Sequence, residues 1–336
     1  MDDLPPQVRD RLRAAFAEDL SPEEAVRRII AGVRERGDDA VRRYGDLLDG
    51  REGPAPERTR KLIVTRDEID EAYGLVDESV VETLRRAAER IRTYHQRQRA
   101  HAATSFVKDG VGQLVSPLDR VGLYVPGTAV VYPSTVLMTA LPARVAGTRE
   151  VVMASPAGPD GRVAPIKLVA ADIAGVDWVV RAGGAQAIAA LAYGTESIPS
   201  VDKICGPGNL FVTLAKRAVF GDVGVDGVYG PSETIVIADD SALPELCAAD
   251  LLAQAEHDEL ATPILLTTSA TLAEATVAEV ERQLRLIPRA EVARTALSAR
   301  GGIAVLSSLE EAIALANDYA PEHLCLLVRD AEALLP

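Results

Sequence analysis

A chain of 336 residues with 48% hydrophobic side chains has enough apolar material for about two domains of ordinary size, which excludes an intrinsically disordered protein. The formal net charge of -14 at pH 7 disfavours broad attraction to nucleic acid or to an anionic membrane. We therefore expect a globular protein whose partner is a small molecule.

The N-terminal sequence and the cysteine pattern lead us to expect a cytoplasmic protein. The first six residues, MDDLPP, contain neither a basic nor an apolar segment of a secretory signal. No apolar stretch approaches the roughly 20 residues that cross a bilayer. Cys205, Cys247 and Cys325 are odd in number and have no CxxC spacing, which favours reduced core thiols over disulfides or a thiolate zinc site.

The first 105 residues or so carry the pattern of charged helices. A helix is expected to begin near Pro22 and to end at Gly37, and apolar residues recur at three- and four-residue spacing from Val80 to Ala100. This part of the chain is predicted to be scaffold. Its first 20 residues form a helical N-terminal arm in this prediction.

From about residue 118 short β-branched runs alternate with Ala-rich helical segments, a rhythm typical of a parallel sheet covered by helices on both faces. Strands are expected at 121–125, 150–154, 178–181 and 203–205, with helices at 135–146, 164–173, 185–193 and 209–220. A second set adds strands at 234–238, 263–267 and 302–306 and helices from 244 to about 259, at 271–286 and at 308–317.

The expected fold class is α/β, with two Rossmann-like parallel-sheet domains and the helical arm. We predict that residues 21–118 and 235–336 form the first domain, with metal and catalytic residues, and that 119–234 form a second, inserted domain with the cofactor contacts. No strand is followed by the GxGxxG fingerprint of a standard dinucleotide fold.

Two glycine-containing turns stand after predicted strands, where open α/β sheets bind ligands. Gly206-Pro207-Gly208-Asn209 precedes one helix, and Gly183-Gly184-Ala185-Gln186 opens another. Backbone amides at such turns suit the diphosphate of a nicotinamide cofactor. The alternatives are an ordinary tight turn at 206–209 and a helix entry with a solvated Gln186.

Gln254 and His257 lie three residues apart near the end of a predicted helix, which places both side chains on one face. An amide oxygen and an imidazole nitrogen suit a borderline divalent ion, although zinc usually takes four ligands. The alternative is a surface helix with a solvated histidine.

Glu322 and His323 stand at a predicted helix-to-strand corner. A carboxylate and an imidazole there supply two proton-transfer groups of different pKa, which suits oxidation of an alcohol followed by hydration of an aldehyde. Because neighbouring side chains of a strand point to opposite faces, joint action requires irregular backbone at this point. The alternative is a turn with exposed charges.

Together these segments resemble the histidinol dehydrogenase family from about Val33 onward. The resemblance rests on several motifs in the right order: VGLYVPGTAVVYPSTVLM (121–138), GGAQAIAALAYGTESIPSVDKICGPGN (183–209), GPSE (230–233), QAEH (254–257) and APEHL (320–324). It implies the last step of histidine biosynthesis: zinc-requiring oxidation of L-histidinol through L-histidinal to L-histidine, with two NAD molecules reduced in succession.

The resemblance also assigns roles to residues. In that family zinc holds the imidazole and amine of the substrate, so Gln254 and His257 would bind zinc and, with it, the substrate. Ser232 would contact substrate, Glu322 would activate the attacking water, and His323 would act as acid and base and contact substrate. Tyr124, Gln186 and Asn209 match the family's NAD-contacting positions.

The family continues beyond the segment that matches Leu335-Pro336. That continuation carries a further zinc-binding Asp, the last zinc His and a substrate-contacting Glu, and no residue here matches those three. We therefore expect this chain to be the front part of a longer protein that supplies two of four zinc ligands. The resemblance implies a homodimer in the complete form.

Two other readings stay open. The same scaffold could serve another polar alcohol, as in the related sulfopropanediol dehydrogenases. Alternatively, the chain could be a truncated remnant that keeps both α/β cores, binds metal poorly and does not catalyse.

Overall fold

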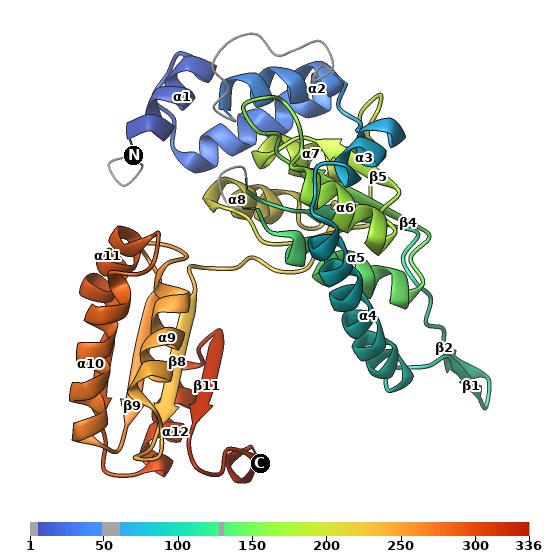
Figure 1. The fold of residues 1–336 in the computed structure, drawn as a ribbon. Helices are drawn as coiled ribbons and strands as arrows, with labels where there is room; N and C mark the ends of the chain where they lie inside the picture. Colours follow the sequence, from blue (N-terminus) through green and yellow to red (C-terminus); the bar gives the residue numbers. More distant parts are fainter. Residues whose placement is uncertain (1–5, 49–60, 128–130, 336) are drawn as a thin grey trace. The chain divides into compact units, whose positions relative to one another are not determined.

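The computed structural model describes residues 6–48, 61–127 and 131–335. The chain divides into two compact units, Met1–Tyr229 and Gly230–Pro336, and each is built on its own parallel sheet (Figure 1). The predicted fold class is confirmed: both units are α/β, and helices form the N-terminal region.

Four helices open the first unit: α1 (Pro6–Phe16), α2 (Pro22–Leu48), α3 (Arg66–Tyr73) and α4 (Glu78–Ala100). The helical segment that begins at Pro22 ends at Gly37 as expected, although α2 as a whole continues to Leu48. Gly37 leaves the helical dihedrals with a φ of 51°, and the helix resumes after this kink. The Glu196 carboxylate accepts a hydrogen bond from the amide of Asp38 at 2.8 Å, which satisfies a donor that the kink frees.

The first sheet has the strand order β5-β4-β3-β6-β7, and every pairing in it is parallel. Its strands are β3 (Arg120–Tyr124), β4 (Glu150–Ser155), β5 (Trp178–Arg181), β6 (Lys203–Cys205) and β7 (Gly224–Val225). The intervening helices are α5 (Pro133–Ala146), α6 (Pro165–Ala174), α7 (Gly184–Tyr193) and α8 (Leu210–Val219).

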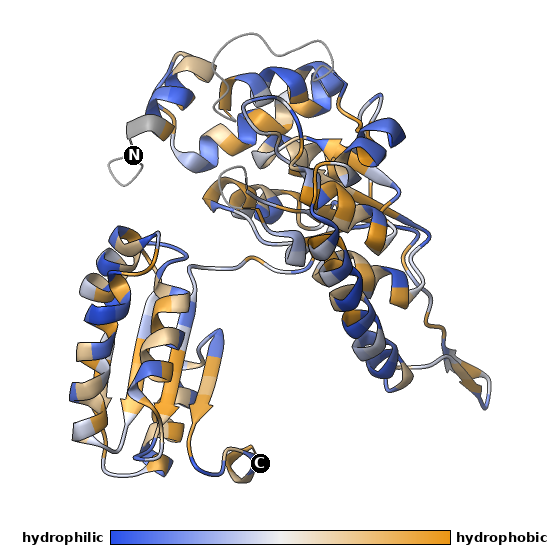
Figure 2. Ribbon diagram, viewed as in Figure 1, coloured by the Kyte–Doolittle hydropathy of each residue, from blue (hydrophilic) through white to orange (hydrophobic). Residues whose placement is uncertain are grey.

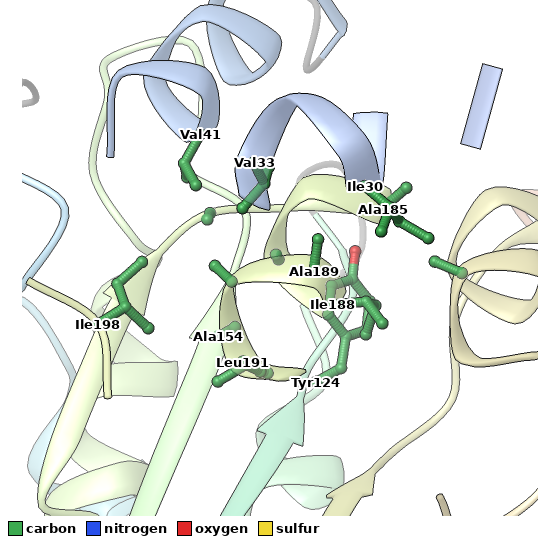
Figure 3. Packing of buried hydrophobic residues seen from close by; sticks show 14 of the residues in the cluster. Ile30, Val33, Val41, Tyr124, Ala154, Ala185, Ile188, Ala189, Leu191 and Ile198 are labelled. Carbon is green, nitrogen blue, oxygen red and sulfur yellow. The ribbon is translucent and has the colours of Figure 1, made fainter. Parts of the chain in front are cut away.

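Alternating side chains give this sheet a core on each face. Tyr124, Val152 and Val180 face α2, α7 and α8, and Figure 3 shows Ile30 and Val33 of α2 packed near Ala185 and Ile188 of α7. Leu123, Met153 and Val179 belong to the second core, which includes residues of α3, α4, α5 and α6. Burial on both faces explains why these strands read as continuous apolar runs.

The second unit has the strand order β10-β9-β8-β11, again parallel throughout. Its elements are β8 (Glu233–Ala238), α9 (Pro244–Ala255), β9 (Thr262–Thr267), α10 (Ala270–Leu284), α11 (Ala290–Arg300), β10 (Gly302–Val305), α12 (Leu309–Tyr319), β11 (His323–Leu327) and the 3-10 helix η2 (Glu332–Leu334). Val236 and Leu265 face α9 and α10, whereas Ile235 and Leu266 face α12. Figure 2 shows the apolar strands between helices with more polar outer faces.

Several elements were not expected. The antiparallel hairpin of β1 (Phe106–Lys108) and β2 (Val111–Gln113), the short strand β7 and helix α11 carry weak patterns in the sequence. In the first unit, α2 packs on α7 and α8, and α4 packs on α5. The predicted grouping of 21–118 with 235–336 into one domain stays a prediction. None of the helices in the described part of the chain is long and apolar enough to cross a membrane.

Candidate functional site

Tyr124 and Gly184 join two strand ends of the first sheet. Tyr124 ends β3, and its hydroxyl accepts a hydrogen bond from the amide of Gly184 at 3.0 Å, at the start of α7. The first amides of a helix have no partner within the helix, so this bond satisfies one of them. Figure 3 shows the buried Tyr124 ring beneath α7, beside Ile188. Tyr124 thus fixes the start of the helix that carries Gln186.

Gln186 is buried rather than solvated. Only 1% of its surface is exposed, although it lies in the first turn of α7. A Cβ added at Gly184, whose φ is +60°, would lie 2.8 Å from the Gln186 side-chain oxygen. The alternative of a helix entry with a solvated glutamine is therefore wrong for this residue. Its amide instead folds back onto the glycine turn.

The turn at 206–209 packs closely on β3. Gly206 has a φ of +118°, and a Cβ there would collide with the carbonyl oxygen of Tyr124. Asp226 accepts a hydrogen bond from the Gly206 amide at 2.7 Å, while Lys216 donates one to the Gly206 carbonyl at 3.0 Å. Lys216 and Asp226 also form a salt bridge with each other. The backbone of Gly206 is therefore held at both of its polar groups.

Asn209 caps the helix that follows this turn. Its side-chain oxygen accepts hydrogen bonds from the amides of Phe211 at 3.1 Å and Val212 at 3.2 Å. Capping of this kind contributes about 1 kcal/mol to stability. Because the oxygen is engaged and the residue is exposed, the amide NH2 is the group that Asn209 can offer a ligand. The three predicted cofactor residues thus gather at the carboxyl edge of the first sheet.

The predicted substrate and catalytic residues lie at the amino edge of the second sheet. Ser232 immediately precedes β8, and its carbonyl accepts a hydrogen bond from the amide of Thr262, the first residue of β9. His323 begins β11 and pairs in register with Thr234 of β8. Helix α9 runs back from the carboxyl end of β8 to the amino end of β9, so its last turn, with Gln254, also reaches this edge.

The side chains of Glu322 and His323 lie close together, although neighbouring side chains of a regular strand point to opposite faces. The Glu322 Oε1 and His323 Nε2 atoms are 3.9 Å apart. Ala320 adopts a left-handed φ of 55° at the end of α12, and Glu322 lies in a bend before the strand begins. The irregular backbone that joint action requires is therefore present. The two side chains are 45% and 51% exposed, so both are open to a ligand.

His323 lies on the α9 side of the sheet. Cys325 is two residues further along β11, and its thiol donates a hydrogen bond to Asp250 of α9 at 2.8 Å. Because side chains two apart in a strand share a face, His323 points to the same side as Cys325. Asp250 lies one turn before Gln254, so one helix face meets the strand that bears His323.

His257 lies just past the helix rather than in it. Helix α9 ends at Ala255, and the His257 amide donates a hydrogen bond to the Gln254 carbonyl at 3.1 Å in the turn that follows. This turn, instead of the predicted helix, keeps the two residues close. Gln254 is half-buried and His257 exposed.

The donor set for a metal is partial. An imidazole nitrogen and an amide oxygen are chemically acceptable to zinc, but two ligands do not close a tetrahedral site. In residues 6–48, 61–127 and 131–335, no three His, Cys, Asp or Glu side chains cluster closely enough to hold an ion. These residues therefore fit two positions of a zinc site and no more.

Two buried lysines at the carboxyl edge of the first sheet were not predicted from the sequence. Lys216 holds Gly206, as described above, and Lys167 of α6 donates hydrogen bonds to the carbonyls of Pro126 and Gly127, the residues just after β3. The only signal in the sequence is a lysine inside an apolar helical run, PIKLVAADIA for α6 and LFVTLAKRAV for α8. Such a pattern also fits a lysine whose amine reaches solvent.

Comparison with known proteins identifies a family for this chain. A sequence model described as histidinol dehydrogenase matches residues 13–336. The chain is 50% identical over 317 residues to a histidinol dehydrogenase of Dehalococcoides mccartyi, which covers 94% of this chain and 71% of that protein. It is 48% identical over 335 residues to one from Deinococcus radiodurans, covering 99% of this chain and 75% of the relative. A crystal structure of histidinol dehydrogenase from Elizabethkingia anophelis superposes with a TM-score of 0.86 at 33% identity, over 98% of this chain and 76% of that one.

Proposed function

Because the chain belongs to the histidinol dehydrogenase family of oxidoreductases, we propose that it oxidises L-histidinol to L-histidine by way of L-histidinal, with NAD as hydride acceptor and zinc as a required metal. Apart from family membership, one observation carries the proposal. The Glu322 carboxylate and the His323 imidazole lie 3.9 Å apart at the sheet edge that the end of α9 also reaches.

The proposed reaction needs proton transfer at two stages. In the first, His323 takes the hydroxyl proton of L-histidinol while a hydride leaves the carbinol carbon for NAD, which yields L-histidinal. Water would then add to the aldehyde: Glu322 would take a proton from the water, and His323 would return its proton to the aldehyde oxygen, which gives the hydrate and a neutral imidazole. In the second oxidation the hydrate would lose a hydroxyl proton to His323 and a hydride to a second NAD, which yields the carboxylic acid of L-histidine, and this acid ionises to the carboxylate by losing a proton to water. Ser232 would hold the substrate by a hydroxyl hydrogen bond.

Gln254 and His257 would hold the zinc ion. When bound, the metal would orient the imidazole and amine of the substrate, which lowers the entropic cost of placing the carbinol carbon. Both residues come from one turn at the end of α9, in which the His257 amide donates a hydrogen bond to the Gln254 carbonyl.

Tyr124, Gln186 and Asn209 would hold NAD. Their position supports this part of the proposal, because open α/β sheets bind nucleotides outside the carboxyl ends of their strands. Gly206 and Gly184 both adopt positive φ there, which lets the backbone of Tyr124 approach Gly206 and the side chain of Gln186 approach Gly184. This arrangement replaces the GxGxxG fingerprint that the chain lacks.

The test is the stoichiometry of the reaction. Zinc-supplemented protein should release two NADH molecules for each L-histidinol consumed and form L-histidine, measured by absorbance and by chromatography. Glu322→Gln and His323→Asn serve as matched variants. The proposal fails if metal-supplemented protein forms no NADH from L-histidinol. Oxidation of another polar alcohol in place of L-histidinol would identify a related dehydrogenase with the same fold and a different substrate.

The assembly and location are proposed on the family resemblance. We infer that the protein functions as a homodimer in the cytoplasm, with no nucleic-acid or membrane partner. Sedimentation velocity tests the dimer, because a monomer at micromolar concentration would contradict it. Cell fractionation tests the location.

A further inference from the structure

Lys167 is a buried lysine whose three N–H groups are all used. None of its surface is exposed. Its amine donates hydrogen bonds to the carbonyl of Pro126 at 2.8 Å, the carbonyl of Gly127 at 2.6 Å and the hydroxyl of Ser155 at 3.0 Å. An ammonium group has three donors, so this geometry saturates it with neutral acceptors.

The position is unfavourable for a cation. Burial lowers the pKa of Lys167 to about 8. The residue also lies in the first turn of α6, where the helix dipole is positive. Its neighbours Ile166, Leu168 and Val169 all pack in the apolar core. An apolar side chain would occupy such a place at lower cost, so the amine is held there at the expense of stability.

Lys167 controls the backbone that leaves β3. Pro126 and Gly127 follow Tyr124 by two and three residues, and Gly127 has a φ of +98°. Tyr124 in turn contacts the amide of Gly184 and packs against Gly206. The three hydrogen bonds of Lys167 therefore fix one wall of the same carboxyl edge to which the glycine turns belong.

Comparison with Lys216 shows what is particular to Lys167. Lys216 is also buried and also holds a glycine carbonyl at this edge, but Asp226 neutralises it. For Lys167, no carboxylate of the described residues lies within salt-bridge distance. Its positive charge therefore remains uncompensated by a carboxylate in direct contact, beside the Pro126–Gly127 backbone.

We propose that Lys167 is a positioning residue for the diphosphate of the dinucleotide: it fixes the Pro126–Gly127 backbone and places an uncompensated positive charge beneath that edge. This inference rests on the proposed use of NAD. A diphosphate carries two negative charges, so a cation in a low-dielectric site stabilises it without touching it. Adenosine, which shares the purine and one ribose but has no phosphate, should gain nothing from this charge.

The experiment compares wild type with Lys167→Met, which fills the same space without charge or donors. Lys108→Met, on the exposed strand β1, removes the same charge elsewhere and is the matched control. Binding of NADH, ADP-ribose and adenosine is measured by titration on the full chain, and KM for NAD, KM for L-histidinol and kcat are measured on the zinc-supplemented protein. Since Lys167→Met can fail to fold, Lys167→Gln, which keeps two donors for the carbonyls, is measured beside it.

The expected result is a loss of roughly tenfold or more in affinity for NADH and ADP-ribose in both Lys167 variants, with adenosine affinity unchanged. The KM for NAD should rise in parallel, while the KM for L-histidinol and kcat stay near those of wild type and of Lys108→Met. Wild-type affinity for ADP-ribose in a folded Lys167→Met or Lys167→Gln protein overturns the inference alone. Failure of the wild type to bind NADH and ADP-ribose overturns the proposed NAD dependence as well.

Discussion

The thiol of Cys325 donates a hydrogen bond to the carboxylate of Asp250 at 2.8 Å, and this contact ties β11 to α9. His323 lies two residues before Cys325, and Gln254 lies four residues after Asp250. This hydrogen bond, together with the apolar packing of β11 against α9, joins the strand that begins with the proposed acid–base residue to the helix that ends with a proposed zinc ligand. The chemistry of that thiol can be tested directly.

We expect Cys325 to be inert toward alkylation in the folded protein. Burial, followed by the hydrogen bond to Asp250, raises its pKa to about 12, and burial also raises the pKa of Cys205 and Cys247. The thiolate is the reactive form, so at pH 8 the folded chain should take up iodoacetamide far more slowly than the unfolded chain at all three cysteines. Mass spectrometry of timed samples measures this. Labelling of Cys325 at the unfolded rate would show that its hydrogen bond to Asp250 does not persist in solution.

Replacement of His323 by Asn should reduce turnover by roughly 10² to 10⁴ and leave the fold intact, because general acid–base catalysis contributes about that much and the side chain is half exposed. Steady-state kinetics with L-histidinol measures the loss, and circular dichroism checks the fold. The Glu322→Gln variant should slow the oxidation of L-histidinal more than that of L-histidinol. Near-normal turnover in His323→Asn would remove this residue from the mechanism.

Replacement of His257 by Ala should weaken zinc binding by roughly tenfold or more, because it removes one of the two donors that the end of α9 supplies. Competition with a chromogenic chelator measures the affinity. His101→Ala, at the exposed end of α4, is the matched control and should bind zinc as wild type does. Equal zinc affinity in the two variants would make the Gln254 and His257 assignment wrong.

Removal of the Tyr124 hydroxyl in Tyr124→Phe should cost about 1 kcal/mol of unfolding free energy, because the Gly184 amide loses its acceptor. It should also weaken NADH binding severalfold, since the start of α7 is then less firmly held. Urea unfolding and NADH titration measure the two effects, with Tyr94→Phe on the exposed face of α4 as control. An unchanged NADH affinity would separate Tyr124 from the cofactor site.

Lys167 should make the stability of the protein depend on alkaline pH. Its pKa is lowered from 10.5 to about 8 in the folded state, so between those values the unfolded chain binds more protons and the free energy of unfolding rises with pH. Between pH 8 and pH 10.5, the free energy of unfolding of wild type should rise by up to about 3 kcal/mol relative to that of Lys167→Met. Urea unfolding of both proteins at each pH measures the difference, in which other titrating groups cancel. A difference independent of pH would mean that the amine is not desolvated.

The fold class and nearly all strands of the two parallel sheets could be predicted from the amino-acid sequence alone. Runs such as 151–154 and 235–238 are apolar throughout because both faces of a parallel sheet are covered, and this pattern is local information. Motif order was equally decisive: five separate stretches, from VGLYV to APEHL, indicated the family that the comparisons confirm. Their position after or before strands also placed Asn209 and His323 at sheet edges.

How those residues meet could not be predicted from the sequence pattern. Burial of Gln186 depends on packing between distant segments. The left-handed backbone at Ala320, before Glu322 and His323, and the turn that places His257 past α9 are local features that the hydrophobic periodicity does not indicate. Lys167 is the clearest example. A lysine in an apolar helix is compatible with an amine that reaches water, and only the packing of α6 beneath the end of β3 directs it to the Pro126 and Gly127 carbonyls, 41 and 40 residues earlier. Local periodicity predicts which face of a helix or strand is buried, but it does not predict which backbone atoms that face contacts.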